Sequence, residues 1–272
     1  MFKRIAIILI MLLSVTGSFV SAALAQDTFS VGLECNYAPF NWTQTDDSNG
    51  AVAIKGGGGF CGGYDVEIAK AIAEYLGKEL VIVKTEWDGL IPAVNAGKID
   101  AVIAGMSPTE ERKFSVDFSD PYYESDLVIV VKADGPYAAA SSLEDFSNAK
   151  ITAQLNTFHD TVVDQIPNVK HVTAMETFPA MIVALNAGKV DGYVSERPGA
   201  ISAQEANPGL TFVEFEEGKG FEASPEDVAV AVAMKKGNEI LPDVNAALEQ
   251  ISKEQRQELM DSAIANQPVS MD

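Results

Sequence analysis

The feature that most constrains the fold is a segment that occurs twice in the chain. Residues 87–105 read WDGLIPAVNAGKIDAVIAG and residues 178–196 read FPAMIVALNAGKVDGYVSE, and the two copies align without a gap. Each copy has an apolar stretch with helical spacing and then a glycine, Gly97 or Gly188, where a helix end favours a left-handed residue. Lys-Ile-Asp or Lys-Val-Asp then leads into a strand. We therefore predict a helix-to-strand step used twice, once in each of two similar lobes.

A strand-like segment precedes each copy. FSVGLE at 29–34 precedes the first copy, KITAQL at 150–155 precedes the second, and Tyr64–Leu76 is the clearest helix. Strands that alternate with helices of this length indicate parallel sheets built from βαβ units. The predicted fold class is α/β, with two lobes that each have a mixed, mostly parallel sheet flanked by helices.

The chain must cross between the lobes twice. Strand-like runs begin at Leu127, after DPYYESD, and at Val228, after an acidic stretch that contains glycine. A helix around Leu241–Ile251 then returns the C-terminal segment to the first lobe. The predicted parts are lobe 1 at residues 26–124 and 228–272, lobe 2 at residues 125–227, and crossings near residues 124–127 and 225–229.

The first 25 residues have the three parts of a secretory signal peptide. Lys3 and Arg4 precede an apolar run at 5–13, and a small-residue site ends at Ala25. A transmembrane anchor is the competing interpretation, but it needs about 20 apolar residues, and serine, threonine and glycine interrupt this run. We predict that residues 1–25 are removed and that the protein is periplasmic or otherwise extracytoplasmic.

Export would place the chain's 2 cysteines, Cys35 and Cys61, in an oxidising compartment. A pair of cysteines is bridged there more often than free, so we predict one disulfide, with two buried thiols as the alternative. The 2 histidines, His159 and His171, are far in sequence from both cysteines. This spacing does not fit a zinc site, and we expect no metal.

Charge and motifs exclude several functions. With 19 basic and 39 acidic residues the formal net charge is −20, whereas nucleic acids and anionic membranes are bound by clustered Lys and Arg. The run at 57–62 fits G-x-G-x-x-G only by counting, because no apolar strand precedes it. The sequence has no Walker lysine motif, no G-x-S-x-G elbow and no His-Glu-x-x-His pair. We therefore expect no catalytic residues, no cofactor and no nucleic-acid partner, but a monomer that binds a small molecule.

In open α/β sheets ligands bind beyond the carboxyl ends of the strands. Four predicted strands end at residues that could contact a ligand. These residues are 34–37, 105–107, 156–157 and Glu196. If the two lobes face each other, these residues meet in one cleft. Glu34 and Glu196 could each hold a cationic group there, or be ordinary exposed acids of an acidic protein.

The segment from Ser107 to Arg112, SPTEER, predicts a helix start. Ser107 suits the N-cap and Pro108 the first helical position, while Glu110 completes a capping box. Free N–H groups at a helix start bind anions, and the planar fork of Arg112 suits a carboxylate. The alternative is an arginine on a solvated helix face paired with Glu110 or Glu111. Thr157 likewise either caps its own helix or reaches the ligand.

Aromatic side chains could form walls of the cleft. Tyr37, Trp42, Phe60 and Trp87 are available for apolar or cation-π contacts, although aromatic residues are more often part of the core. Trp87 opens the first repeat copy, which places it nearer the predicted cleft than Trp42.

Three motifs in order, GYDVEIA at 63–69, WDGLIP at 87–92 and GMSPTEERKFSVDFSDPYY at 105–123, resemble a known family. Over almost all of the chain after residue 25, the sequence is similar to the family 3 extracytoplasmic solute-binding proteins, which deliver polar amino acids to ABC importers. The resemblance implies a type II periplasmic-binding-protein-like fold, in which two hinge strands join lobes that close on one amino acid. It also implies a membrane permease as partner and no enzymatic activity.

The resemblance implies roles for particular residues. Arg112 would hold the ligand α-carboxylate, Glu196 the α-ammonium group, and Glu34 would face the distal end of the side chain. The candidate ligand-binding residues are Glu34, Tyr37, Trp87, Gly105, Met106, Ser107, Arg112, Asn156, Thr157 and Glu196. Tyr37 and Trp87 would sandwich the ligand side chain. The chain departs from the family where many relatives have Gly-Thr-Thr and it has NTF at 156–158, and in a glycine-rich insertion at 49–63.

Glu34 and Trp87 together favour arginine or lysine, by charge pairing and cation-π contact. Glutamine is the alternative, because Glu34 could accept from an amide. A second class is an exported enzyme of the same fold, similar to cyclohexadienyl dehydratases, and a third is a sensory module that acts through a receptor. The dehydratase substrates lack a distal cation, so two cleft acids disfavour that class.

Overall fold

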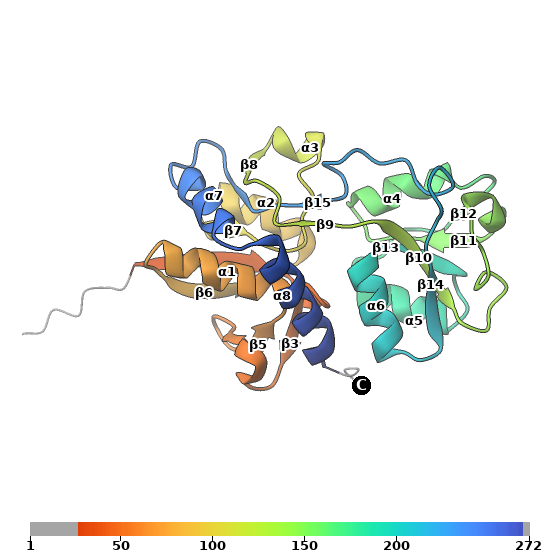
Figure 1. Ribbon diagram of the computed structural model, residues 1–272, viewed down its shortest axis with the longest axis horizontal. Helices are drawn as coiled ribbons and strands as arrows, with labels where there is room; N and C mark the ends of the chain where they lie inside the picture. Colours follow the sequence, from red (N-terminus) through yellow and green to blue (C-terminus); the bar gives the residue numbers. More distant parts are fainter. Residues whose placement is uncertain (1–26, 269–272) are drawn as a thin grey trace, which may run out of the picture.

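The computed structural model describes residues 27–268, so the predicted signal peptide at 1–25 lies outside the described residues. Two α/β lobes lie side by side, with α1, α2 and α7 in one and α4, α5 and α6 in the other (Figure 1). The predicted fold class is confirmed. No helix within residues 27–268 is long and apolar enough to cross a membrane. The helices are α1 (Tyr64–Tyr75), α2 (Trp87–Asn95), α3 (Glu110–Lys113), α4 (Phe158–Val162), α5 (Phe178–Asn186), α6 (Arg197–Ala206), α7 (Leu241–Glu249) and α8 (Lys253–Asn266).

Each lobe is built on a five-stranded sheet of the same topology. The first sheet has the order β6-β1-β7-β16-β8 and the second the order β12-β11-β13-β10-β14. In both sheets the first three strands are parallel and the fourth is antiparallel to its two neighbours. The strands of lobe 1 are β1 (Thr28–Leu33), β6 (Glu79–Lys84), β7 (Ala101–Val102), β8 (Val116–Phe118) and β16 (Ala233–Lys235). Those of lobe 2 are β10 (Leu127–Lys132), β11 (Lys150–Thr152), β12 (Lys170–His171), β13 (Gly192–Glu196) and β14 (Leu210–Val213).

Two short strands pass between the lobes. β9 (Tyr123–Glu124) pairs antiparallel with β15 (Ala229–Val230), and both lie between the two sheets in Figure 1. β9 leads into β10 of the second sheet, and β15 leads into β16 of the first. In each sheet the antiparallel fourth strand, β10 or β16, therefore comes directly after a crossing between the lobes. After the second crossing α7 and α8 pack against α1.

The duplicated segment forms the same helix end in both lobes. Gly97 and Gly188 both have φ of 68°, a left-handed conformation that glycine adopts without steric cost. The next residue in each copy, Lys98 or Lys189, donates its N–H at 2.9 Å to the carbonyl five residues earlier. These are the bonds of a Schellman motif, and they end α2 and α5 at equivalent positions. The predicted helix-to-strand repeat is confirmed.

The aspartate that follows the helix end in both copies forms a hydrogen bond to a neighbouring strand. Asp100 accepts the Ser30 N–H at 2.7 Å and the Ser30 hydroxyl at 2.6 Å. Asp191 accepts the Lys150 N–H at 2.8 Å in the other lobe. Each carboxylate thus ties the start of the repeat strand to the neighbouring strand, β1 or β11.

Alanine at either aspartate is expected to lower the free energy of unfolding by about 1–3 kcal/mol, because a charge-assisted bond to a backbone N–H is lost. Urea unfolding of Asp100→Ala and Asp191→Ala measures this. Asp134→Ala, which removes an exposed acid from a turn, is the control. If both substitutions change the free energy of unfolding no more than the control does, the aspartates do not hold the strands together.

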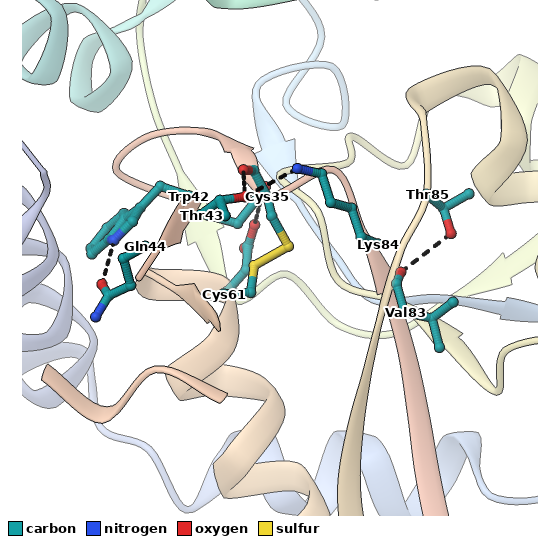
Figure 2. Close-up of a disulfide and its surroundings, with 10 residues drawn as sticks. Cys35, Trp42, Thr43, Gln44, Cys61, Val83, Lys84 and Thr85 are labelled. Atoms are coloured by element: carbon teal, nitrogen blue, oxygen red, sulfur yellow. Dashed lines mark hydrogen bonds between the residues drawn. A yellow bond between two sulfur atoms is a disulfide. The ribbon is translucent and has the colours of Figure 1, made fainter. Parts of the chain in front are cut away.

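A small four-stranded sheet and a disulfide lie beside the first sheet. Its order is β2-β3-β5-β4, from β2 (Asn36–Tyr37), β3 (Asn41–Gln44), β5 (Phe60–Gly62) and β4 (Val52–Ala53). The predicted disulfide is confirmed, since Cys35 is bonded to Cys61 with 5.7 Å between their Cα atoms (Figure 2). Both cysteines are fully buried.

Candidate functional site

Asn156, in the turn after β11, joins the two lobes at three points. Its carbonyl oxygen accepts from Trp87 Nε1 at 3.2 Å and from Arg112 Nη2 at 3.2 Å. Its side-chain amide donates to Asp88 Oδ1 at 2.9 Å. Since Trp87, Asp88 and Arg112 belong to lobe 1, the lobes are held together at this edge.

The Arg112 guanidinium is the cation of the site. Nη1 donates to the Ser107 carbonyl at 3.0 Å, and the guanidinium carbon lies 5.0 Å from the centroid of the Trp87 ring. Burial lowers the pKa of Arg112 to about 10, so the side chain is charged at neutral pH. A planar, charged fork held this way can bind a carboxylate through two parallel hydrogen bonds.

The predicted start of the helix that carries Arg112 is wrong. Ser107 is not the N-cap: α3 spans only Glu110–Lys113, and its N-cap is Thr109, whose hydroxyl accepts the Arg112 N–H at 3.4 Å. Thr109 has an extended backbone (φ −59°, ψ 153°), which excludes it from the helix. A helix with Ser107 as N-cap would need Thr109 to be helical, which its backbone rules out. Arg112 therefore lies in the first turn after Thr109, and its side chain returns to the Ser107 carbonyl.

Glu196, at the end of β13, is a buried carboxylate with partners from both lobes. Oε2 accepts from the Tyr37 hydroxyl of lobe 1 at 3.3 Å. Oε1 lies 3.6 Å from Nε2 of His159, in α4. The other ring nitrogen of His159 is buried and has no hydrogen-bond partner within residues 27–268. Burial, together with the Glu196 charge, raises the pKa of Tyr37 well above its usual value.

Glu34, after β1, is the second buried acid, and its side chain faces Gln154 of lobe 2. Gln154 Nε2 lies 3.4 Å from both carboxylate oxygens and also donates to the Glu176 carbonyl at 3.1 Å. Burial raises the pKa of Glu34 to about 7, which outweighs the opposing hydrogen bond from Gln154. The charges of Glu86 and Asp88 act in the same direction as burial. Glu34 therefore changes charge near neutral pH.

The aromatic residues form two groups. The Tyr37 ring stacks on Phe178 with 4.1 Å between centroids and on Phe40 with 4.9 Å. Trp87 covers Arg112 instead. Tyr37 and Trp87 line the same cavity, and their sandwiching of a ligand side chain stays a prediction. Trp42 lies 5% exposed in the small sheet, and Phe60 is part of β5.

A cavity of about 10 Å³ lies between the lobes where these groups meet. It is lined by Tyr37, Trp87, Gly105, Ser107, Arg112, Gln154, Thr157, Phe158 and His159. Glu34 and Glu196 lie behind this lining, Glu34 in contact with Gln154 and Glu196 in contact with His159 and Tyr37. Gly105 must be glycine here, since it has φ of 62° and a Cβ would lie 2.8 Å from the Tyr37 ring.

Two predicted site residues have other partners. Met106 is buried, and its carbonyl accepts the Ala231 N–H at 3.0 Å beside β15. The Thr157 hydroxyl does not cap α4 but donates to the Gln154 carbonyl at 2.7 Å. The capping alternative for Thr157 is therefore wrong, because the hydroxyl is used by the turn that precedes the helix. Its contact with a ligand stays a prediction.

Sequence reasoning missed Gln154, His159 and Phe178. Phe178 occupies the position in the second repeat copy that Trp87 has in the first, so the same comparison could have placed it at the cleft. Gln154 is a polar residue in an apolar strand-like run, which is a signal for a buried contact. Within residues 27–268 no group of three or more His, Cys, Asp or Glu is arranged to hold a metal ion.

Comparison with known proteins gives one consistent result. The family model described as "Bacterial extracellular solute-binding proteins, family 3" matches residues 29–264. A Campylobacter jejuni protein named "Probable histidine-binding protein" is 34% identical over 197 residues, which is 71% of this chain and 70% of that protein. The Escherichia coli K12 "L-cystine-binding protein TcyJ" is 29% identical over 229 residues, or 84% of this chain and 78% of that protein.

A solved structure has the same fold over most of this chain. An amino acid ABC transporter substrate-binding protein from Streptococcus pneumoniae, bound to L-arginine, superposes with a TM-score of 0.76 at 28% identity, over 88% of this chain and 94% of that chain. These three relatives are all named as binding proteins, and an ancestral amino-acid-binding protein described as a precursor of cyclohexadienyl dehydratase also matches, with a TM-score of 0.70 at 31% identity, over 87% of this chain and 95% of that chain. The chain therefore belongs to family 3 of the bacterial extracellular solute-binding proteins.

Proposed function

We propose that this chain captures a basic L-amino acid, arginine or lysine, between its two lobes and delivers it to the permease of an ABC importer. One observation carries the proposal: Arg112 of lobe 1 lines a small cavity between the lobes, and the buried Glu196 of lobe 2 contacts His159 and Tyr37, which line the same cavity. An amino acid presents a carboxylate and an ammonium group on one carbon. Two opposite charges on opposite lobes match those two groups.

The α-carboxylate binds to Arg112, with Gly105, Ser107 and Thr157 beside it in the cavity wall. Asn156 holds Arg112 in place through its carbonyl, and Met106 fixes the strand end. The α-ammonium group binds to Glu196, where it joins the Tyr37 hydroxyl. Charge-assisted bonds of this kind are about twice as strong as neutral ones.

The side chain of the ligand lies between Trp87 and Tyr37 and reaches toward Glu34. A guanidinium or ammonium group stabilises the ionised form of Glu34, whose pKa is about 7 without it. The relatives above are named as a probable histidine-binding protein and an L-cystine-binding protein, and the solved structure is bound to L-arginine. Arginine fits a site that offers both a buried acid, Glu34, and an indole, Trp87. Glutamine is the alternative ligand, since Glu34 and Gln154 can both bond an amide.

Capture follows from closure of the lobes, 26–124 with 228–272 against 125–227, about β9 and β15. The ligand bridges Arg112 and Glu196 only when the lobes are closed, so it shifts the population toward that state. No covalent step is needed, and we assign no catalytic residue. The first 25 residues act as the signal peptide for export, in accord with an extracellular family.

A thermal-shift panel of the twenty amino acids with ornithine and citrulline tests the proposal. At about 100 times its dissociation constant a ligand adds about 2.7 kcal/mol, which is expected to raise Tm by roughly 5–10 °C for a chain of this size. Arginine and lysine are expected to give the largest shifts, with glutamine smaller. Shifts only with acidic or aliphatic amino acids would contradict the assignment. Turnover of prephenate or arogenate would show an enzyme instead.

A further inference from the structure

Cys35 lies within the short segment that carries two candidate ligand-binding residues. Glu34 precedes it and faces Gln154 of lobe 2, and Tyr37 follows two residues later and donates to Glu196 of lobe 2. Both contacts cross the cleft. The conformation of the backbone at Cys35 therefore decides where both side chains point.

That conformation is unusual for a residue with a side chain. Cys35 has φ of 52°, in the left-handed region that glycine adopts freely and other residues avoid. For an L-residue the cost corresponds to roughly 5- to 30-fold in population. Another part of the structure must hold the segment in this turn.

Two contacts hold Cys35, and a third supports one of them (Figure 2). Its sulfur is bonded to Cys61 of β5, and both residues are fully buried. Its carbonyl accepts from the Thr43 hydroxyl at 2.8 Å, and that hydroxyl accepts from Lys84 Nζ at 3.1 Å. The disulfide is the covalent member of this set, and it fixes the segment to the small sheet rather than to the cleft.

We propose that the Cys35–Cys61 disulfide is a positioning element for ligand binding, which holds residues 34–37 in the left-handed turn that directs Glu34 and Tyr37 across the cleft. This inference rests on the proposed function. Without the cross-link, an ordinary residue at position 35 relaxes to other conformations. Only the fraction of molecules that keeps the turn binds ligand well, so the apparent Kd rises by the inverse of that fraction.

Two double variants that differ by one methyl group test the proposal. C35A/C61A and C35G/C61A both lack the disulfide, and only glycine adopts the left-handed turn freely. Calorimetric titration with arginine at a temperature where both are folded is expected to give a Kd raised roughly 5- to 30-fold for C35A/C61A. For C35G/C61A we expect a Kd within about threefold of the wild type, although both variants lose a similar amount of thermal stability.

Two results would overturn the proposal. One is a C35A/C61A variant whose Tm is lowered but whose Kd equals that of the wild type. The disulfide would then stabilise the fold without positioning the ligand-binding residues. The other is equal weakening in both variants, which would exclude the turn at Cys35 as the cause. If C35A/C61A does not fold, wild-type protein reduced with a phosphine is compared with C35G/C61A in the same titration.

A measurement without ligand separates this inference from the proposed function. Hydrogen exchange of a peptide that covers residues 34–37 is expected to speed up in C35A/C61A and much less in C35G/C61A. Equal exchange in the two variants overturns the positioning role. If the two variants differ in this way but the wild type binds no amino acid, the proposed function is contradicted and the positioning of the segment stands.

Discussion

Replacing Arg112 by alanine is expected to weaken amino-acid binding by roughly 10²- to 10³-fold, which corresponds to about 3–4 kcal/mol. The substitution removes the partner of the ligand carboxylate and leaves that carboxylate in a site from which water is largely excluded. It also removes the contact of Arg112 with the Asn156 carbonyl, which joins the lobes at 3.2 Å. Isothermal titration with arginine measures the loss, and circular dichroism shows that the variant is folded.

Arg197→Ala is the matched control. Arg197 is an arginine of lobe 2 with its side chain 51% exposed, paired with Glu214 at 2.5 Å outside the cavity. Its removal is expected to leave the Kd unchanged, since exposed pairs contribute little. Arg112→Lys keeps the charge without the planar fork and should bind with intermediate affinity. An unchanged Kd for Arg112→Ala would refute the carboxylate assignment.

The affinity for arginine is expected to increase more than tenfold from pH 5.5 to pH 7.5. With the lobes in contact and no ligand bound, burial raises the pKa of Glu34 to about 7, so in that arrangement the carboxyl group is mostly protonated at the lower pH. A cationic ligand side chain favours the ionised form and lowers the pKa in the complex. The complex then holds fewer protons than the free protein, so affinity rises with pH below 7 and levels off above it.

Glu34→Gln separates this effect from other titrating groups. The variant cannot ionise at position 34, so its affinity for arginine should be weaker and lose most of the increase with pH. Glutamine, which carries no distal charge, should show the smaller pH dependence with the wild type. An affinity for arginine that falls as pH rises, or the same increase in Glu34→Gln, would mean that Glu34 does not face the cation.

The architecture could be predicted because a local signal occurs twice. Gly97 and Gly188 each end a helix, and Asp100 and Asp191 each fasten a strand, so the repeat defines equivalent elements in two lobes. The helix ends at the glycines are local, and the residue pattern was sufficient to predict them, whereas the bonds of the two aspartates to neighbouring strands were found in the structure. Sheet order beyond them depends on the crossings at β9 and β15.

The helix start at Ser107 shows the limit of a local pattern. Ser107 and Thr109 both suit an N-cap, and the capping-box spacing favoured the first. In the structure the Thr109 hydroxyl accepts the Arg112 N–H, and residues 107–109 all lie before the helix. The spacing of side chains cannot distinguish these two starts when a proline lies between them.

The site was harder to predict than the fold because its contacts join distant parts of the chain. Gln154 meets Glu34 across 120 positions, and Tyr37 meets Glu196 across 159. Such contacts depend on how the lobes meet, which no local pattern describes. Arg112 and Glu196 were candidates from the SPTEER segment and the strand ends, and the resemblance to a family added their roles, whereas Gln154 and His159 emerged only from the three-dimensional arrangement.

A crystal structure of the protein with L-arginine tests most directly whether one zwitterion is held from both lobes. We expect the ligand carboxylate within hydrogen-bond distance of Arg112 and the ammonium group on Glu196, with the guanidinium directed toward Glu34. A ligand that touches one lobe only, or that leaves Arg112 and Glu196 to solvent, would contradict the proposed mechanism.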